Sequence, residues 1–288
     1  MITDIILLSI AFIALVIASI SDLKTREVPD WLSYAVIFIA FGIRGIYSLA
    51  TFNWMYLVYG LVGFGIFVAI AYAMFYAGQW GGGDAKMIMG LGVLIGVPLS
   101  LKQMPLLAVF FINVLVAGAV YGLCWIIGLS IKHRKKIAKE FREQLSKNKV
   151  LRYVVGIAFL ILLVLIVVSA TDAVIKMWLA VIVALFYALF YLFMIVKAVE
   201  KVSMYVHVSP EKLTEGDWIA KDYYDGKKRI CGPKDLGIEK KQIKKLIAMK
   251  RKGRIKKVRI KMGIPFVPSF LIAYVATMFL GAWWMFLI

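Results

Sequence analysis

The chain has 288 residues, of which 62% are hydrophobic, and its formal net charge is +19. Soluble globular domains contain roughly 45–50% apolar residues, so the composition excludes an ordinary soluble protein and indicates one that crosses a membrane several times. No nucleic-acid-binding motif or aromatic stacking platform accompanies the charge, so we expect no nucleic-acid partner. The two cysteines cannot supply a disulfide framework or a four-thiolate zinc site, and we expect neither a metal nor another cofactor.

Apolar runs of membrane-spanning length recur along the chain. A spanning helix needs about 20 apolar residues. The first run begins at Ile2 without the basic leader of a signal peptide, so we interpret it as a retained helix. The sequence predicts an all-α polytopic membrane protein with about eight transmembrane helices; six or seven are alternatives, because the fourth run is short and rich in glycine. The predicted spans are 2–21, 31–51, 54–78, 85–101, 103–130, 153–171, 173–197 and 264–287.

The basic residues are concentrated in a few of the loops between these spans. If the N-terminus is outside, the inside loops hold thirty of the 35 Lys and Arg residues, and the outside turns hold only Lys102. These inside loops are 22–30, 79–84, 131–152 and 198–263. An excess of Lys and Arg is typical of cytoplasmic loops, and such clusters attract anionic lipid headgroups. We therefore expect a multi-pass protein of the cell membrane, with its N-terminus outside and with membrane lipids as partners of its basic loops.

The same spans divide the chain into three regions. We predict a transmembrane region at 1–197 with a basic cytoplasmic loop at 131–152, a basic cytoplasmic insertion at 198–263, and a final transmembrane helix at 264–288. The insertion contains a lysine-rich segment with a partial apolar face, residues 237–251, followed by an alternating pattern typical of a short strand. We predict either a small α+β domain or an amphipathic segment that lies on the inner leaflet.

Two acidic residues stand at the ends of apolar runs. Asp22 ends the first span, and Asp84 follows the run Gly81-Gly82-Gly83 before the fourth, so the predicted topology places both at the cytoplasmic membrane surface. An ionisable residue beside membrane-length apolar sequence is a functional-site candidate. Glycines before it allow a tight turn and a close approach of another main chain. Two neighbouring carboxyl groups that share a proton can hydrolyse a peptide bond, one activating water and the other polarising the carbonyl.

Structural interpretations of the same acids remain open. Asp84 fits the N-cap of a helix, and Asp22 fits a polar turn that closes the first helix. Asp30 is better explained as the N-cap of the second span, and Glu27 as a solvated loop residue. Lys86 is either a side chain that reaches to the membrane surface or a charge that favours the ionised form of the pair.

A function of another class is also open. Acids in membrane segments serve proton and cation paths, so a proton- or cation-coupled transporter that uses Asp22 and Asp84 is the alternative. Such a path favours acids near the bilayer midplane, whereas these two are expected at one edge. Arg44 is the other charge in the middle of a predicted span.

Three regions of the chain resemble the GxGD membrane aspartyl proteases, and among them the archaeal preflagellin and prepilin (type IV leader) peptidases. Residues 22–30, DLKTREVPD, are similar to the first catalytic loop of that family. Residues 81–86, GGGDAK, match GxGDxK, and residues 263–268, GIPFVP, resemble the G-x-P-F-x-P entry into the final helix. The order and spacing of these motifs cover nearly the whole chain, with the insertion as the least similar part.

The resemblance implies an aspartic endopeptidase. Asp22 and Asp84 would be its catalytic pair, with Gly81, Gly83 and Lys86 in the active-site loop. It would remove a short basic leader from flagellin-like or type IV pilin-like precursors at the cytoplasmic face. Many bacterial relatives carry a four-cysteine domain and methylate the new N-terminus; since this chain has two cysteines, we expect protease activity without N-methyltransferase activity.

Overall fold

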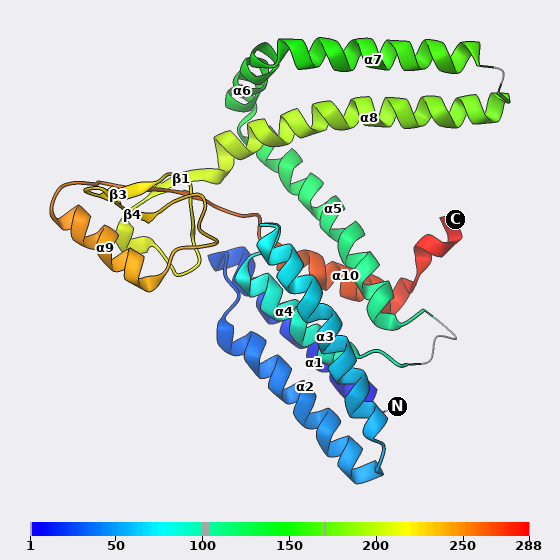
Figure 1. The fold of residues 1–288 in the computed structure, drawn as a ribbon. Coiled ribbons are helices and arrows are strands. Elements are labelled where there is room, and N and C mark those ends of the chain that lie inside the picture. Colours follow the sequence, from blue (N-terminus) through cyan, green and yellow to red (C-terminus); the bar gives the residue numbers. More distant parts are fainter. Residues whose placement is uncertain (1, 100–103, 170, 288) are drawn as a thin grey trace. The chain divides into compact units, whose positions relative to one another are not determined.

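The computed structural model describes residues 2–99, 104–169 and 171–287, and helices make up most of it (Figure 1). The chain divides into two compact units. The first comprises Met1–Cys124, Ser209–Val258 and Gly263–Ile288, and the second comprises Trp125–Val208 and Arg259–Met262. Most of the insertion thus belongs to the same unit as Asp22 and Asp84.

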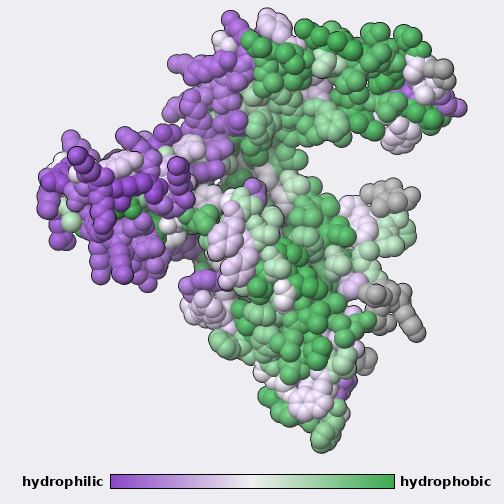
Figure 2. All heavy atoms as spheres, in the orientation of Figure 1, coloured by the Kyte–Doolittle hydropathy of each residue, from purple (hydrophilic) through white to green (hydrophobic). Residues whose placement is uncertain are grey.

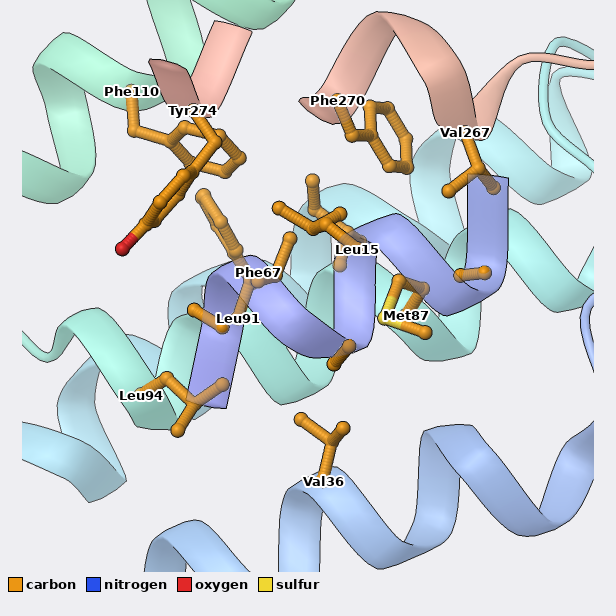
Figure 3. Packing of buried hydrophobic residues seen from close by; sticks show 14 of the residues in the cluster. Leu15, Val36, Phe67, Met87, Leu91, Leu94, Phe110, Val267, Phe270 and Tyr274 are labelled. Carbon is orange, nitrogen blue, oxygen red and sulfur yellow. The ribbon is translucent and has the colours of Figure 1, made fainter. Parts of the chain in front are cut away.

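The first unit is a bundle of apolar helices around a short central one. Its helices are α1 (Ile2–Thr25), α2 (Asp30–Thr51), α3 (Trp54–Tyr76), α4 (Gly82–Ile95), most of α5 (Leu106–Lys132) and α10 (Val267–Leu280). Helix α4 packs against α1, α2 and α3, while α10 packs against α1. Figure 3 shows the shared core, in which Met87 and Leu91 of α4 lie among side chains from the surrounding helices, such as Leu15 and Phe67.

Glycines bring α3 and α4 into backbone contact. A Cβ atom on Gly63 of α3 would overlap the carbonyl oxygen of Gly92 in α4, and one on Gly92 would overlap that of Gly63. On another side of α4, a Cβ on Gly90 would lie 2.8 Å from Cγ1 of Val36. Small residues of this kind allow helices in membranes to pack closely. They let α4 bury eight of its 14 residues.

Among the described residues, six helices are long and apolar enough to span a membrane: α1, α2, α3, α5, α7 (Lys149–Val168) and α8 (Ala173–Val199) with its continuation to Met204. The predicted all-α polytopic class is confirmed. Helices α4 and α10 have only 14 residues each, a length of about 21 Å, which is less than the bilayer core of about 30 Å. The number of described helices of full spanning length is therefore six, the lowest of the predicted counts.

Buried polar side chains donate hydrogen bonds to the carbonyls at the C-terminal ends of both short helices. The last carbonyls of a helix lack partners within it, and a buried carbonyl left without a partner is costly. Arg44 of α2 donates from Nε to the Val93 carbonyl at 2.7 Å and from Nη2 to the Leu94 carbonyl at 3.0 Å. Its Nη1 donates to the carbonyl of Tyr56 at 2.9 Å. The one charge predicted within a span thus closes the end of α4.

Asn113 of α5 acts in the same way on α10. Its Nδ2 donates to Thr277 Oγ1 at 3.0 Å and to the carbonyl of Gly281, the C-cap of α10, at 3.2 Å. Trp283 Nε1 then donates to Asn113 Oδ1 at 3.1 Å. Both sides of the buried amide are therefore hydrogen-bonded.

The second unit contains α6 (Arg134–Lys147), α7, α8, the π-helical turn η1 (Glu200–Met204) and strand β1 (Tyr205–Val208), beside which lies β5 (Val258–Lys261). Helix α6 occupies most of the basic segment 131–152, where we predicted a loop between spans. It forms because Ile137 and Phe141 pack on Ala198 and Val199 of α8. No described residue of α7 is buried, and hydrophobic side chains cover α7 and α8 in Figure 2, as expected for helices in contact with lipid.

The insertion folds as a small α+β structure. It contains η2 (Pro210–Lys212), β2 (Trp218–Ile219), β3 (Tyr223–Asp225), β4 (Lys228–Cys231) and α9 (Lys240–Arg251). Strands β3 and β4 are antiparallel, with Tyr224 opposite Arg229. Helix α9 packs on η2 and β4 with Leu246 and Met249 buried, so protein covers its apolar face and the alternative of a segment lying on the leaflet is not needed. Lys250 holds α9 to η2, and together with Ser209 it lowers the pKa of Glu211 to about 2.

The contact between Gly63 and Gly92 gives a stability prediction with a control in the same helix. Gly63→Ala places a methyl group against the α4 backbone, and we expect it to reduce stability by about 1–3 kcal/mol, the usual cost of overpacking. A Cβ on Gly65 meets nothing within 4 Å, so Gly65→Ala should leave stability unchanged or slightly higher. Thermal unfolding of the two purified proteins in detergent checks this, and equal midpoints would contradict the close packing of α3 and α4.

Candidate active site

Asp22 lies in the last turn of α1 and is buried, with 4% of its surface exposed. Its Oδ2 accepts a hydrogen bond from the backbone N–H of Val267 at 2.9 Å. Val267 is the first residue of α10, so the Asp22 carboxylate caps the N-terminus of that helix. The polar turn expected at Asp22 is therefore a long-range contact between the first and last helices of the chain.

Arg26 strengthens this contact. It follows the end of α1 with φ +62°, in the left-handed region, and its N–H donates to the Asp22 carbonyl at 2.9 Å. Its guanidinium donates to the carbonyl of Gly263, at the start of the segment that leads to Val267. The Arg26 charge also acts on the Asp22 carboxylate. Side chains from one turn thus hold both ends of the segment 263–267.

Asp84 is the third residue of α4. Gly81 is the N-cap of α4, and Asp84 Oδ2 accepts from its N–H at 2.9 Å, so Asp84 supplies the helix half of a capping box. The interpretation of Asp84 as the N-cap residue itself was wrong by three positions. A carboxylate in the first turn is favoured by the helix dipole.

The glycine run before Asp84 allows close packing against a neighbouring loop and does not itself form the tight turn. Gly81 has φ −73°, and among the described glycines the positive φ value in this loop belongs to Gly78, at +66°. A Cβ on Gly83 would lie 3.0 Å from Cβ of Val28, which follows Asp22 in the neighbouring loop. The expected close approach is thus present, and the tight turn lies three residues before the run.

The two acids come together although more than 60 residues separate them. The charge of Asp22 acts on the Asp84 carboxyl group, and the contact between Val28 and Gly83 joins the loops that carry them. Each carboxyl group also accepts one backbone N–H. The arrangement provides two interacting carboxyl groups at the beginnings of two short helices.

Lys86 and Asp30 form a separate pair beside this site. Lys86 Nζ donates to Asp30 Oδ1 at 2.6 Å and lies 5.4 Å from the centre of the Tyr34 ring. Asp30 is the first residue of α2, and its N-cap is Pro29, so the N-cap assignment for Asp30 was wrong. The ion pair joins the start of α4 to the start of α2.

Glu27 contacts the insertion, which no sequence pattern predicted. Its exposed carboxylate accepts a hydrogen bond from Thr214 Oγ1. Burial, together with the Glu27 charge beside it, raises the pKa of Asp217, while the N–H of Thr214 opposes the shift. The ring of Trp218 lies 3.5 Å from the Cβ position of Gly78. Glu27 is therefore part of a contact and not only a solvated residue.

No group of three His, Cys, Asp or Glu side chains suited to a metal ion occurs in the part of the chain that the structure describes. The cysteines lie apart from the site, Cys124 exposed and Cys231 buried. Burial raises the pKa of Cys231 to about 11, which disfavours the thiolate that a nucleophile or metal ligand needs.

The region that contains both acids is similar to known proteins. Residues 9–123 match the model of the type IV leader peptidase family. Preflagellin peptidases are similar to the chain: that of Methanocaldococcus jannaschii is 40% identical over 83 residues, that of Methanococcus maripaludis 38% over 88, and that of Methanococcus voltae 37% over 87. No solved structure matches the chain.

The matches cover part of each protein. They include 29–30% of this chain and 35–37% of the relatives, so the chain matches about a third of the length of the curated relatives. The motif at 263–268 and the insertion lie outside the matched family region. The resemblance to the type IV leader peptidases is therefore confirmed for residues 9–123, the region that contains Asp22 and Asp84.

Proposed function

We propose that this protein is a membrane aspartyl endopeptidase that removes the short basic leader from flagellin-like or type IV pilin-like precursors. One observation carries the proposal: the region that matches the leader peptidase family contains two carboxyl groups, Asp22 and Asp84, that interact with each other. The names of the similar proteins support a preflagellin-like precursor as substrate.

The proposed reaction uses the two acids as one unit. Neighbouring carboxyl groups share a proton, because two adjacent negative charges are unfavourable. The ionised member takes a proton from a water molecule, whose oxygen attacks the carbonyl carbon of the scissile bond. The protonated member donates to the carbonyl oxygen, and the resulting tetrahedral intermediate collapses when the amine accepts a proton and leaves. The pair titrates together, so neither residue has a separate pKa in this scheme.

The proposed location is the cytoplasmic face of the cell membrane, with the N-terminus outside. The concentration of Lys and Arg in the insertion and around α6 supports this orientation. Anionic headgroups are the lipid partners that such basic segments attract. The hydrophobic segment of the precursor would stay in the membrane while its basic leader reaches the acids from the cytoplasm.

We propose protease activity alone, without N-methylation of the product. The four-cysteine domain of many bacterial relatives is not part of this sequence, which has Cys124 and Cys231. The proposal uses no metal or other cofactor.

The structure gives little support to a proton- or cation-coupled transporter. Arg44, the charge within a span that such a path would use, donates three hydrogen bonds to backbone carbonyls around the end of α4. Asp22 and Asp84 lie at helix ends and each accepts a backbone N–H. These positions suit a site at one edge of the membrane better than a path across it.

Replacing either acid tests the proposed chemistry. We expect Asp22→Asn and Asp84→Asn each to abolish leader removal while the protein still accumulates in the membrane, because the amide can neither activate water nor share a proton. Asp30→Asn keeps an oxygen acceptor for Lys86 and should retain substantial activity. The measurement incubates purified protein with flagellin-like and pilin-like precursors and sequences the new N-termini. Normal processing by either of the first two variants would sink the assignment.

The proposed orientation can be tested by labelling. Lys227 is exposed in the turn between β3 and β4, and a cysteine there can be introduced into a chain that carries Cys124→Ser and Cys231→Ala. We expect Lys227→Cys to react with a membrane-impermeant maleimide in inverted vesicles and not in intact cells. Labelling from the outside of intact cells would show the opposite orientation and contradict an active site on the cytoplasmic face.

A further inference from the structure

A segment of the insertion contacts both loops that carry the acids. Residues 214–218 lie far from either acid in sequence, yet Thr214 bonds to Glu27 in the loop after Asp22. Trp218 lies against Gly78 in the loop before Asp84. We call residues 214–218 the insertion tip. The leader peptidase match ends at residue 123, so the family match does not include the tip.

The contact with Glu27 reaches the turn that follows Asp22. The Glu27 carbonyl accepts from Ser21 Oγ at 2.9 Å and from Thr25 Oγ1 at 3.3 Å, so the residue is tied to the last turn of α1. The Thr214 hydroxyl then fixes the Glu27 side chain through a charge-assisted hydrogen bond, which is stronger than a neutral one. Loss of that hydroxyl would remove the contact that fixes Glu27 and leave the loop after Asp22 less restrained.

The contact with Gly78 reaches the turn that precedes Asp84. Gly78 adopts φ +66° and donates its N–H to the Phe75 carbonyl at 2.9 Å. The Trp218 ring covers this turn. Two residues further on, Trp80 is buried against Phe270 of α10, with ring centres 5.3 Å apart. The loop that presents Asp84 is therefore held by the insertion on one side and by α10 on the other.

The insertion tip is itself fixed. Gly216 donates its N–H to the Ile238 carbonyl at 2.9 Å, and Ile238 donates to the Asp217 carbonyl at 3.0 Å. The N–H of Thr214 donates to Asp217 Oδ2 at 2.9 Å. Because Ile238 is fully buried just before α9, the tip is anchored to the folded part of the insertion.

We propose that the insertion tip positions the active site, with Thr214 and Trp218 as positioning residues that act through Glu27 and Gly78. The inference rests on the proposed peptidase function and deepens it. Neither residue needs to touch the substrate. Each holds one of the two loops at the separation that lets Asp22 and Asp84 share a proton and a water molecule.

The hydroxyl of Thr214 provides a sharp test. Thr214→Val keeps the shape and removes the donor, and we expect kcat to fall about fivefold or more with KM within about twofold, since small displacements of catalytic groups are costly while substrate contacts remain. Thr214→Ser keeps the donor and should restore kcat. Lys227→Gln changes an exposed residue of the insertion outside the tip, in the turn between β3 and β4, and serves as the control that stays at the wild-type rate.

A double-mutant cycle separates positioning from general loss of stability. Glu27→Gln retains an oxygen acceptor and should keep most of the rate, whereas Glu27→Leu should lower kcat as Thr214→Val does. The combined Thr214→Val and Glu27→Leu protein should lose no more than either single variant, because both remove one interaction. Trp218→Ala should lower kcat as well, and Trp218→Phe should recover part of it.

The outcomes decide between the two proposals. If Asp22→Asn and Asp84→Asn are inactive and Thr214→Val keeps the wild-type kcat, the positioning role is wrong and the peptidase function stands. Additive losses, or kcat losses that follow the thermal unfolding midpoint of each variant, also overturn the positioning role. If the aspartate variants process precursors normally, the peptidase function itself is wrong.

Discussion

The structure depends on how the C-terminal ends of two short helices are hydrogen-bonded. Helices α4 and α10 have 14 residues each. Their last carbonyls have no partners within the helix, and a buried polar group without a hydrogen bond is costly. Arg44 supplies the donors for α4, and Asn113 supplies them for α10. Both residues come from helices of full spanning length. A buried charge and a buried amide are thus part of the support of the fold.

The N-terminal ends of α4 and α10 lie beside the end of α1, where Gly83 contacts Val28 and Val267 contacts Asp22. The first N–H of α10 meets Asp22, and the first turn of α4 contains Asp84. Helix N-termini favour negative charge, so each acid occupies a position that tolerates its ionised form, although the two interact. The proton sharing that we propose for the pair is consistent with these opposed effects.

The sequence predicted the long helices better than the contacts between them. Apolar runs located every long helix, because burial in lipid imposes length and composition directly. The basic segment 131–152 was predicted as a loop and forms α6, although the spacing of Ile137 and Phe141 is helical and could have indicated it. The pairing of Asp22 with Asp84 was expected from the family motifs. The contacts of Arg44, Asn113 and Thr214 join residues far apart in the chain, and no periodicity or spacing in one sequence encodes such partners.

The residues that complete the candidate site lie outside the region that matches the family. Residues 9–123 contain both acids, but the N–H bound to Asp22 comes from Val267. Helix α10 packs on α1 beside α2 and α4, and its Tyr274 hydroxyl donates to the Leu8 carbonyl at 2.7 Å. Without α10, helix α1 would lose one of its packing partners and the Asp22 carboxylate would lose the N–H of Val267, which is costly for a buried carboxylate. The matched region therefore contains both acids, and the later part of the chain supplies the backbone N–H that binds Asp22.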